Sequence, residues 1–464
     1  MHFATEKLPL VGSFFLFFVG ASLLPIVPGD MHAHDQQRFA QWIVLLVSAC
    51  VLRPKATGAM VYAICISLGA TLWGAGAGRW GMLEALHLSG LGMLACLWGA
   101  QLSMRREALL LPAVVLPVLL YVLMLMPRIA ALVFEELAFH VREFFPSFSN
   151  PRFFGYWVTL TLPVIASIER GEVLGDRAVW VRYVLGSIWF FFLLMSGTRG
   201  SLIALVCVAL LSTCCGVQGR TLTGRLLKMA CGGLVLYAMA LCVLPQAATE
   251  GMAHSGAGRV LEGPQLSSRD QLWSLALEGI AIHPLLGNGP MMFAAAANRV
   301  ASHPHNLMLQ LAYEWGIPVA LACMSMLALF LYRRARYASE SCDLRPIAIV
   351  AGLAGGLIQA QLDGVLVMPF SQTYFVLLLA WLISIFSRDT NQGIPVKQSG
   401  RLAKTFCAVL FLNVCAQVVL SNPEWSDLSQ WEQRTLRFYE MDVYQPRFWV
   451  QGVIPGADAG TSNR

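Results

Sequence analysis

The sequence predicts an all-α protein that crosses a membrane about 12–13 times. Of its 464 residues, 57% are hydrophobic and only 12% are charged, whereas roughly 25% of the residues of an ordinary soluble domain are charged. The mean hydropathy is +0.63, and apolar runs close to the length of a bilayer crossing recur along the whole chain. These values exclude a soluble globular enzyme, a disordered scaffold and a disulfide-rich secreted module.

Thirteen apolar runs are candidate spans, and each is expected to be a helix. The runs at 39–52 and 405–420 are the weakest, so an interfacial position is the alternative for both. The first run follows Lys7, as in a signal peptide, but its length and the spans behind it predict an uncleaved helix. The thirteen runs lie at residues 9–28, 39–52, 57–75, 81–101, 108–126, 153–168, 181–195, 200–216, 229–244, 306–331, 346–366, 372–387 and 405–420.

The basic residues are distributed unevenly between alternate connections. With a cytoplasmic N-terminus, 19 of the 32 Lys and Arg residues fall on the inner side, although the inner connections are the shorter ones. The positive-inside rule therefore predicts that orientation. No basic stripe is interleaved with aromatic residues, so nucleic acid is not an expected partner. The 12 cysteines show no zinc-like spacing, and they favour neither a disulfide framework nor a metal site.

This orientation places three long segments outside the membrane. The segment at 127–152 has apolar residues at helical spacing and is expected to contain an interfacial helix. The aromatic residues of the tail favour an interfacial belt over a sugar-binding platform. The expected organisation is N-terminal transmembrane helices at 1–126, the interfacial segment at 127–152, transmembrane helices at 153–244, a large outer loop with short helices at 245–305, C-terminal transmembrane helices at 306–420 and an outer tail at 421–464.

Arg199 lies in a short outer turn, Ser196-Gly197-Thr198-Arg199-Gly200-Ser201, between two strongly apolar runs. An outer arginine runs against the positive-inside bias. One interpretation is a side chain that extends to the membrane surface and has no further role. The other is an anion site that combines the guanidinium with the backbone N–H groups of the glycine-flanked turn.

Arg269 opens a second outer helix. Ser267 and Asp270 have capping-box spacing, and an apolar stripe follows from Leu272 to Ile280. A cation in the first turn is unfavourable, because the helix dipole is positive at that end. A bound anion would reverse the sign of that cost.

His305 belongs to the motif Ser302-His303-Pro304-His305-Asn306, just before a long apolar run. Pro304 suits the first helical position, so His305 is expected in the first turn of that helix. A helix N-terminus disfavours imidazolium, so His305 is expected to be neutral and able to accept a proton. A simple capping role is the alternative. A metal pair with His303 is disfavoured because no nearby carboxylate or cysteine completes a ligand set.

Two acidic residues are candidate supports of this region. Asp363, in Gln361-Leu362-Asp363-Gly364-Val365, is expected near the outer end of its span, where it would orient an arginine or the histidine. Glu314 is expected about 13 Å deeper along the helix than His305, at 1.5 Å per residue, as a packing or hydrogen-bonding residue.

Together these motifs resemble the O-antigen ligase and polymerase superfamily. The resemblance covers roughly residues 145–375. Its motifs are Ser268-Arg269 with Trp273, then His283-Pro284-Leu285-Leu286-Gly287-Asn288-Gly289, then His303-Pro304-His305-Asn306 with Leu307, Gln310, Glu314 and Gly316, the upstream turn Ser196-Gly197-Thr198-Arg199-Gly200, Asn150-Pro151-Arg152-Phe153-Phe154, and Asp363-Gly364-Val365-Leu366-Val367-Met368-Pro369.

The resemblance implies a metal-independent, inverting glycosyltransferase of the GT-C class, without a cofactor, in the bacterial inner membrane. Such proteins move a glycan en bloc from undecaprenyl diphosphate to a hydroxyl on the periplasmic face. The acceptor is lipid A–core or a Ser/Thr side chain of a protein such as a pilin. The matching roles are general base for His305 and diphosphate binding for Arg199 and Arg269. Arg152, His303, Asp363 and Glu314 are possible supports, although Tyr156-Trp157 stand where a polar Gln is expected after Arg152.

Two alternatives remain open at this point. A polymerase would lengthen the glycan on its own lipid carrier, and only the acceptor distinguishes it from en bloc transfer. A secondary transporter would place charges near the bilayer midplane, usually with repeat symmetry. The unusual charges of this chain gather toward one face, and no repeat is visible.

Overall fold

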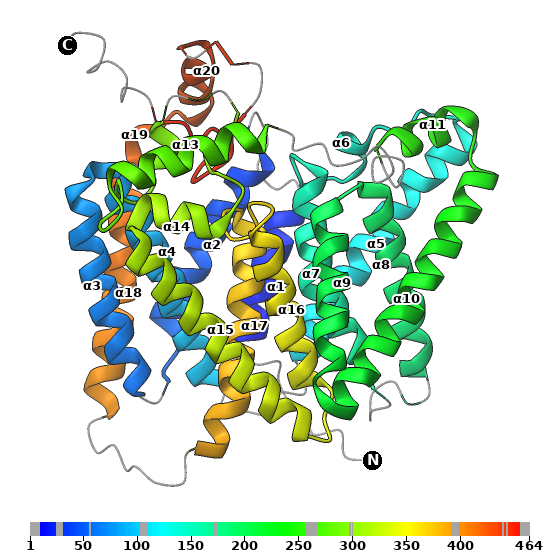
Figure 1. The fold of residues 1–464 in the computed structure, drawn as a ribbon, viewed down its shortest axis with the longest axis horizontal. Helices are drawn as coiled ribbons and strands as arrows, with labels where there is room; N and C mark the ends of the chain where they lie inside the picture. The colour runs from blue at the N-terminus through cyan, green and yellow to red at the C-terminus, as the bar shows by residue number, and fades with distance from the viewer. Residues whose placement is uncertain are drawn as a thin grey trace. The chain divides into compact units, whose positions relative to one another are not determined.

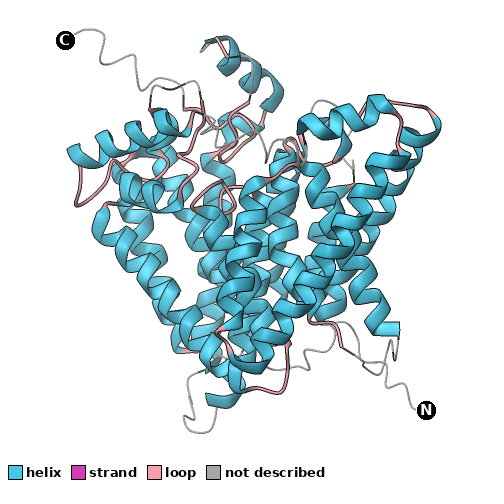
Figure 2. Cartoon of the chain, turned by 45° about the vertical axis from the view of Figure 1, so that its right-hand side comes forward, coloured by secondary structure: helices cyan, strands magenta, loops and turns pink. Residues whose placement is uncertain are grey.

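The computed structural model describes residues 10–24, 31–54, 57–102, 110–169, 175, 177–255, 268–296, 298, 300–390, 399–438, 440–441 and 444–454. Within these residues the backbone forms helices and connecting loops, and no strand (Figure 2). Eight described helices are long and apolar enough to cross a membrane, and three shorter helices are also apolar. The prediction of an all-α, multi-pass membrane protein is confirmed. Helices suit the lipid bilayer because each helix satisfies its backbone hydrogen bonds internally.

The chain forms two compact units, and the first comprises the described residues of 1–106, 266–327 and 360–464. Its central helix α4 (Gly78–Leu102) packs against α3 (Gly58–Gly76), α17 (Pro369–Thr390) and α18 (Ser399–Leu420) (Figure 1). Leu72 of α3 is 76% exposed, as expected for a lipid-facing side chain. The other elements of this unit are α1 (Leu10–Leu23), α2 (Ala33–Val51), α13 (Arg269–Ile282), the 3-10 helix η2 (Met292–Ala295), α14 (Leu307–Trp315), the first part of α15 (Ile317–Glu340), α19 (Asn422–Trp425) and α20 (Leu428–Phe438).

The second unit comprises the described residues of 107–265 and 328–359. Here α8 (Arg177–Ser196) packs against α7 (Pro151–Ala166) and α10 (Gly216–Val243). Trp157 and Trp189 meet edge to face with ring centroids 4.8 Å apart, which fixes the contact of α7 with α8. The other elements are α5 (Leu110–Phe134), α6 (Val141–Phe144), α9 (Arg199–Thr213), α11 (Gln246–Ser255), the last part of α15, and α16 (Arg345–Ala360) except its final residue.

The predicted single span at 306–331 is wrong, because two helices replace it. Helix α14 ends at Trp315, and α15 starts at Ile317. Gly316 between them has φ +86°, a left-handed conformation that costs glycine little. A Cβ at this position would overlap the carbonyl group of Leu285. The close passage of residues 284–286 therefore requires glycine and separates the two helices.

The helix expected within 127–152 is interrupted, whereas the interfacial position of this segment stays a prediction. Helix α5 continues past Pro127 to Phe134, and the only further helix before α7 is the four-residue α6. Glu136, with φ +50°, lies in the non-helical stretch that separates α5 from α6. The span predicted at 346–366 likewise ends early, because α16 stops at Ala360 and leaves Asp363 in the following loop.

The weak run at 39–52 belongs to a helix in the interior of the first unit. Helix α2 starts at Ala33 and buries polar residues that the hydropathy pattern excluded from the run. Arg38, for example, donates to the carbonyl of Phe448 at 3.0 Å. Phe448 and Trp449 of the tail are buried, and their ring centroids lie 5.9 and 5.5 Å from that of Trp42. These two residues form core, so the interfacial belt predicted for the tail is wrong at this point.

Candidate active site

His305 lies in a loop directly before α14. The N-cap of α14 is Asn306, whose side chain accepts a hydrogen bond from the N–H of Leu309 at 2.9 Å. His305 therefore precedes the helix, and the prediction that Pro304 starts the helix and His305 occupies its first turn is wrong. Asparagine is among the best N-cap residues, so it determines where the helix begins. His305 has φ +52°, an uncommon conformation for a residue with a side chain.

Asp363 lies between His305 and Arg269. Its Oδ1 atom is 3.0 Å from Nδ1 of His305, and its Oδ2 atom is 4.0 Å from Nη2 of Arg269. The Asp363 side chain is only 4% exposed, against 18% for His305 and 21% for Arg269. The backbone N–H of Gly364 donates to Oδ1 at 3.0 Å. A buried carboxylate thus lies within reach of a half-buried imidazole and a half-buried guanidinium.

Arg269 is the first residue of α13, and Asp270 is the acid in that turn. The N-cap is Ser268, with φ +59° and no side-chain capping bond. The predicted capping box involved Ser267, which lies outside the described residues. The cost of a cation at a helix N-terminus is offset here by the carboxylate of Asp363.

His303 is buried and contacts the backbone of the loop that carries His305. It is 3% exposed, and its Nδ1 atom accepts a hydrogen bond from the backbone N–H of His305 at 3.3 Å. The centroids of the His303 and His305 rings are 4.2 Å apart. Burial lowers the pKa of His303 well below its ordinary value, and the positive charge of Arg447 lowers it further. A neutral His303 can accept the hydrogen bond that fixes the backbone of His305, two residues further along the chain.

Hydrogen bonds connect the three segments of this site. Trp273 of α13 donates from Nε1 to the carbonyl of Pro304 at 3.0 Å. The amide of Asn306 donates to the carbonyl of Gln361 at 3.1 Å. A Cβ at Gly364 would lie 2.6–2.8 Å from ring atoms of His303. The loop that carries Asp363 therefore rests directly on the histidine loop, and only glycine permits that approach.

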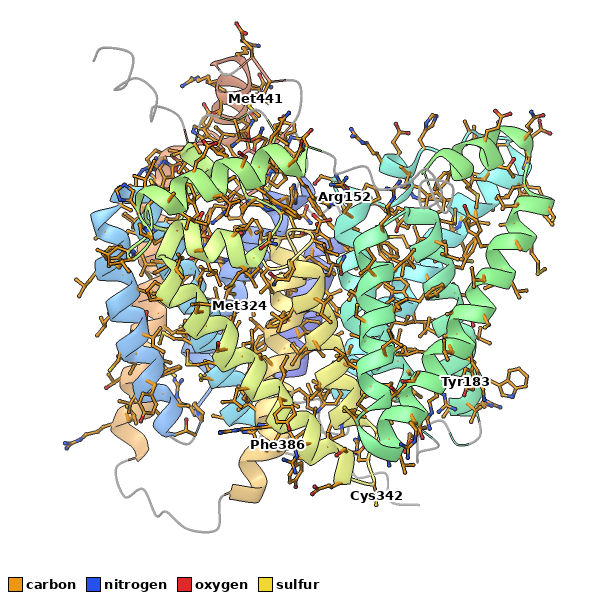
Figure 3. All side chains as sticks on the ribbon, in the orientation of Figure 1. Arg152, Tyr183, Met324, Cys342, Phe386 and Met441 are labelled. Carbon is orange, nitrogen blue, oxygen red and sulfur yellow. The ribbon has the colours of Figure 1, made fainter. Side chains whose placement is uncertain are left out.

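A cavity of about 200 Å³ opens beside Asp363. Apolar side chains form most of its wall, and Met324 is one of them. Figure 3 labels Met324 on α15. Glu84, Gln310 and Glu314 add polar groups. The site thus adjoins a space with both apolar and polar walls.

Arg199 and Arg152 belong to the second unit. Arg199 is the first residue of α9, two positions after Gly197, which has φ +64°. Arg152 lies in the first turn of α7 (Figure 3), and its backbone N–H donates to the side chain of the N-cap residue Asn150 at 3.0 Å. The hydroxyl of Thr198 donates to the carbonyl of Pro151 at 3.5 Å. The short turn predicted before Arg199 is present, and the two arginines start neighbouring helices.

Comparison with known proteins finds a match over residues 184–324 to the family described as O-antigen ligase. Over these residues the chain is similar to the O-antigen ligase family. The matched region includes Arg199, Arg269, His303, His305 and Glu314, and it ends before Asp363. No curated protein matches the chain. The similarity over residues 184–324 is to a family of glycosyltransferase-like enzymes that act on lipid-linked glycans.

Sequence reasoning missed Arg447, the partner of Glu314. Nη2 of Arg447 donates to both carboxylate oxygens of Glu314 at 2.8 Å and to Oε1 of Glu84 at 3.1 Å. Glu314, expected as a packing or hydrogen-bonding residue, makes this buried ion pair. The available signal was an arginine in a tail predicted to lie outside the membrane, which runs against the positive-inside bias as the predicted outer arginines Arg199 and Arg269 do.

Proposed function

We propose that this protein transfers a glycan en bloc from undecaprenyl diphosphate to an acceptor hydroxyl on the periplasmic face of the bacterial inner membrane. The observation that carries the proposal is the position of Asp363 between His305 and Arg269, at 3.0 and 4.0 Å. The O-antigen ligase match supports the reaction class. The distribution of basic residues supports the orientation.

In this proposal His305 is the general base. The carboxylate of Asp363 holds the proton on Nδ1 of the imidazole, which leaves Nε2 free to accept a proton. Nε2 removes the proton of the acceptor hydroxyl while the oxygen attacks the anomeric carbon from the face opposite the diphosphate. The bond between the anomeric carbon and the diphosphate oxygen breaks, so the configuration inverts. The imidazolium then releases its proton to water.

Arg269 stabilises the departing diphosphate. Negative charge grows on the leaving group as an oxocarbenium-like state forms at the sugar. A guanidinium at a helix N-terminus meets that charge with a planar pair of donors. Arg199 is proposed as the second guanidinium, with Arg152 as a possible support. This role for the arginines requires no divalent metal.

The test is reconstitution of the purified protein in proteoliposomes with an undecaprenyl diphosphate-linked glycan. Lipid A–core, a Ser/Thr-containing pilin-type protein and a second lipid-linked glycan are offered in turn as acceptors, with EDTA present. We expect glycan on one of the first two acceptors and release of undecaprenyl diphosphate. Elongation of the lipid-linked glycan alone would identify a polymerase. Absence of transfer to all three would refute the proposal.

Orientation is tested separately by cysteine labelling in cells. A cysteine at position 269 should react with an impermeant reagent from the periplasm, and one at position 334 should not. Labelling of position 269 from the cytoplasm only would contradict the proposed site. The pair is matched because Arg269 and Arg334 are both arginines at predicted membrane boundaries.

A further inference from the structure

The C-terminal loop, residues 444–454, returns from the tail into the first unit. The N–H of Ile454 donates to the carbonyl of Ala294 at 3.1 Å. Ser302, which begins the histidine motif, donates from its hydroxyl to the carbonyl of Gln445 at 2.9 Å. On the other side, Asp35 of α2 accepts from the N–H of Val450 at 2.7 Å. The C-terminal loop thus contacts both a core helix and the segment that leads to His305.

Arg447 is the central side chain of this loop. It is 1% exposed, and its Nη2 atom donates to Glu314 of α14 and Glu84 of α4. Its Nη1 atom donates to the carbonyl of Ser302 at 3.4 Å. One guanidinium therefore joins a transmembrane helix, the helix after His305 and the backbone before it. These contacts hold both ends of the His303–His305 turn.

A fully buried arginine is costly to desolvate, and replacing such an ion network with apolar groups is often neutral or stabilising. A gain in the stability of the folded protein therefore does not account for the buried Arg447 network. Its geometry gives a better reason, because a planar guanidinium with several fixed donors orients the groups that it contacts. The groups oriented here are the carbonyl of Ser302 and the carboxylate of Glu314, on either side of His305.

We propose that Arg447 is a positioning residue, which holds the 302–305 turn so that His305 faces Asp363. The consequence for turnover rests on the function proposed above, whereas the consequence for the turn itself does not. A displacement of about 1 Å at a reacting group lowers turnover by as much as 100-fold. Arg447 therefore acts on the rate through the histidine that it positions.

The first experiment measures hydrogen exchange of the backbone amides of residues 300–306 in detergent-solubilised protein. Arg447→Lys keeps a charge but loses the guanidinium geometry, and it should accelerate exchange in this segment about tenfold or more. Gly452→Ala leaves every charged group in place, but its Cβ would overlap Cβ and the backbone N of Arg447. It should accelerate exchange in the same segment.

Arg79→Met is the matched control. Arg79 lies on the same helix α4 as Glu84 and forms a two-pronged ion pair with Glu424 of the tail, at 2.8 and 2.6 Å. It connects the tail to α4 without touching the histidine motif. Exchange at residues 300–306 should match that of the wild type in this variant. Equal acceleration by Arg79→Met and Arg447→Lys would overturn the proposal, because any loosened tail contact would then have the same effect.

The second experiment separates positioning from folding. Arg447→Met combined with Glu84→Gln and Glu314→Gln removes all three charges of the Arg447 network together, so thermal stability should be higher than that of Arg447→Met alone. The contact with Ser302 stays lost, and kcat should remain about 10–100-fold low with little change in KM for the donor. A stable triple variant with wild-type kcat and wild-type exchange would refute the inference. If exchange at residues 300–306 is faster in Arg447→Lys but the wild-type protein shows no transferase activity, only the proposed transferase function is refuted.

Discussion

Asp363→Asn is the substitution that tests the candidate site most directly. The asparagine side chain has the same shape, so the loop and its contact with His303 should survive. The change removes the negative charge that lies 3.0 Å from Nδ1 of His305. An amide N–H at that point favours the opposite tautomer, in which Nδ1 accepts and Nε2 carries the proton. The base would then face the acceptor hydroxyl with the wrong nitrogen protonated.

The expected loss in kcat follows from this geometry. Loss of a general base typically lowers the rate 10²–10⁴-fold, and a tautomer error in a comparable histidine–aspartate pair lowers it by about 10⁴-fold. These factors correspond to roughly 3–5 kcal/mol in the activation barrier. Arg269 loses a partner 4.0 Å away, which leaves its charge free for the diphosphate. Donor affinity should therefore stay the same or increase.

The assay measures single-turnover transfer and equilibrium donor binding on the same proteoliposome preparation. Asp270→Asn is the matched control, because Asp270 is an exposed acid in the same helical turn as Arg269. It should leave kcat within about twofold, as substitutions at exposed positions usually do. A tenfold weaker donor affinity with unchanged kcat in Asp363→Asn would show that Asp363 serves the diphosphate site rather than the base.

Four further predictions concern neighbouring residues. His305→Ala should lower kcat 10²–10⁴-fold with nearly unchanged donor affinity, and abolished donor binding would identify a phosphate ligand instead. Arg269→Lys keeps the charge but loses the two-donor geometry, so donor titration should show substantially weaker binding, whereas unchanged affinity would remove Arg269 from the diphosphate site. Gly364→Ala places a Cβ 2.6–2.8 Å from the His303 ring, so the free energy of unfolding should fall by the 1–3 kcal/mol typical of overpacking. The midpoint of thermal unfolding should fall with it, and an unchanged midpoint would contradict that contact. Because the pKa of His303 is lowered in the folded protein, its contribution to stability is complete above the unfolded pKa of about 6.5 and is lost as the pH falls below that value, at up to 1.36 kcal/mol per pH unit. His303→Gln should therefore flatten the pH dependence of the free energy of unfolding, measured by chemical unfolding. An unaltered pH dependence would assign it to another group.

Sequence patterns located the parts of the site but not their arrangement. Arg269 stood out as a cation in the first turn of a predicted helix, and His305 as a histidine directly before a long apolar run. The start of α14 was misplaced because Pro304 was favoured over Asn306, although asparagine is itself a strong capping signal. Gly316 in Trp315-Gly316-Ile317 was the available sign that the run at 306–331 contains two helices. Hydropathy does not register a left-handed glycine, so the break went unpredicted.

Composition alone determined that this chain is helical and lies in a membrane. So many apolar residues with so few charges favour the bilayer over water, and the bilayer accepts a backbone only where its hydrogen bonds are satisfied internally. Local motifs also singled out the residues that we propose carry chemistry. Only the tertiary structure decided that Asp363 lies against His305 and that Arg447 reaches Glu314. Those pairs are 58 and 133 positions apart in the sequence. Helical periodicity describes neighbours within a turn or two, whereas contacts between distant segments arise from packing.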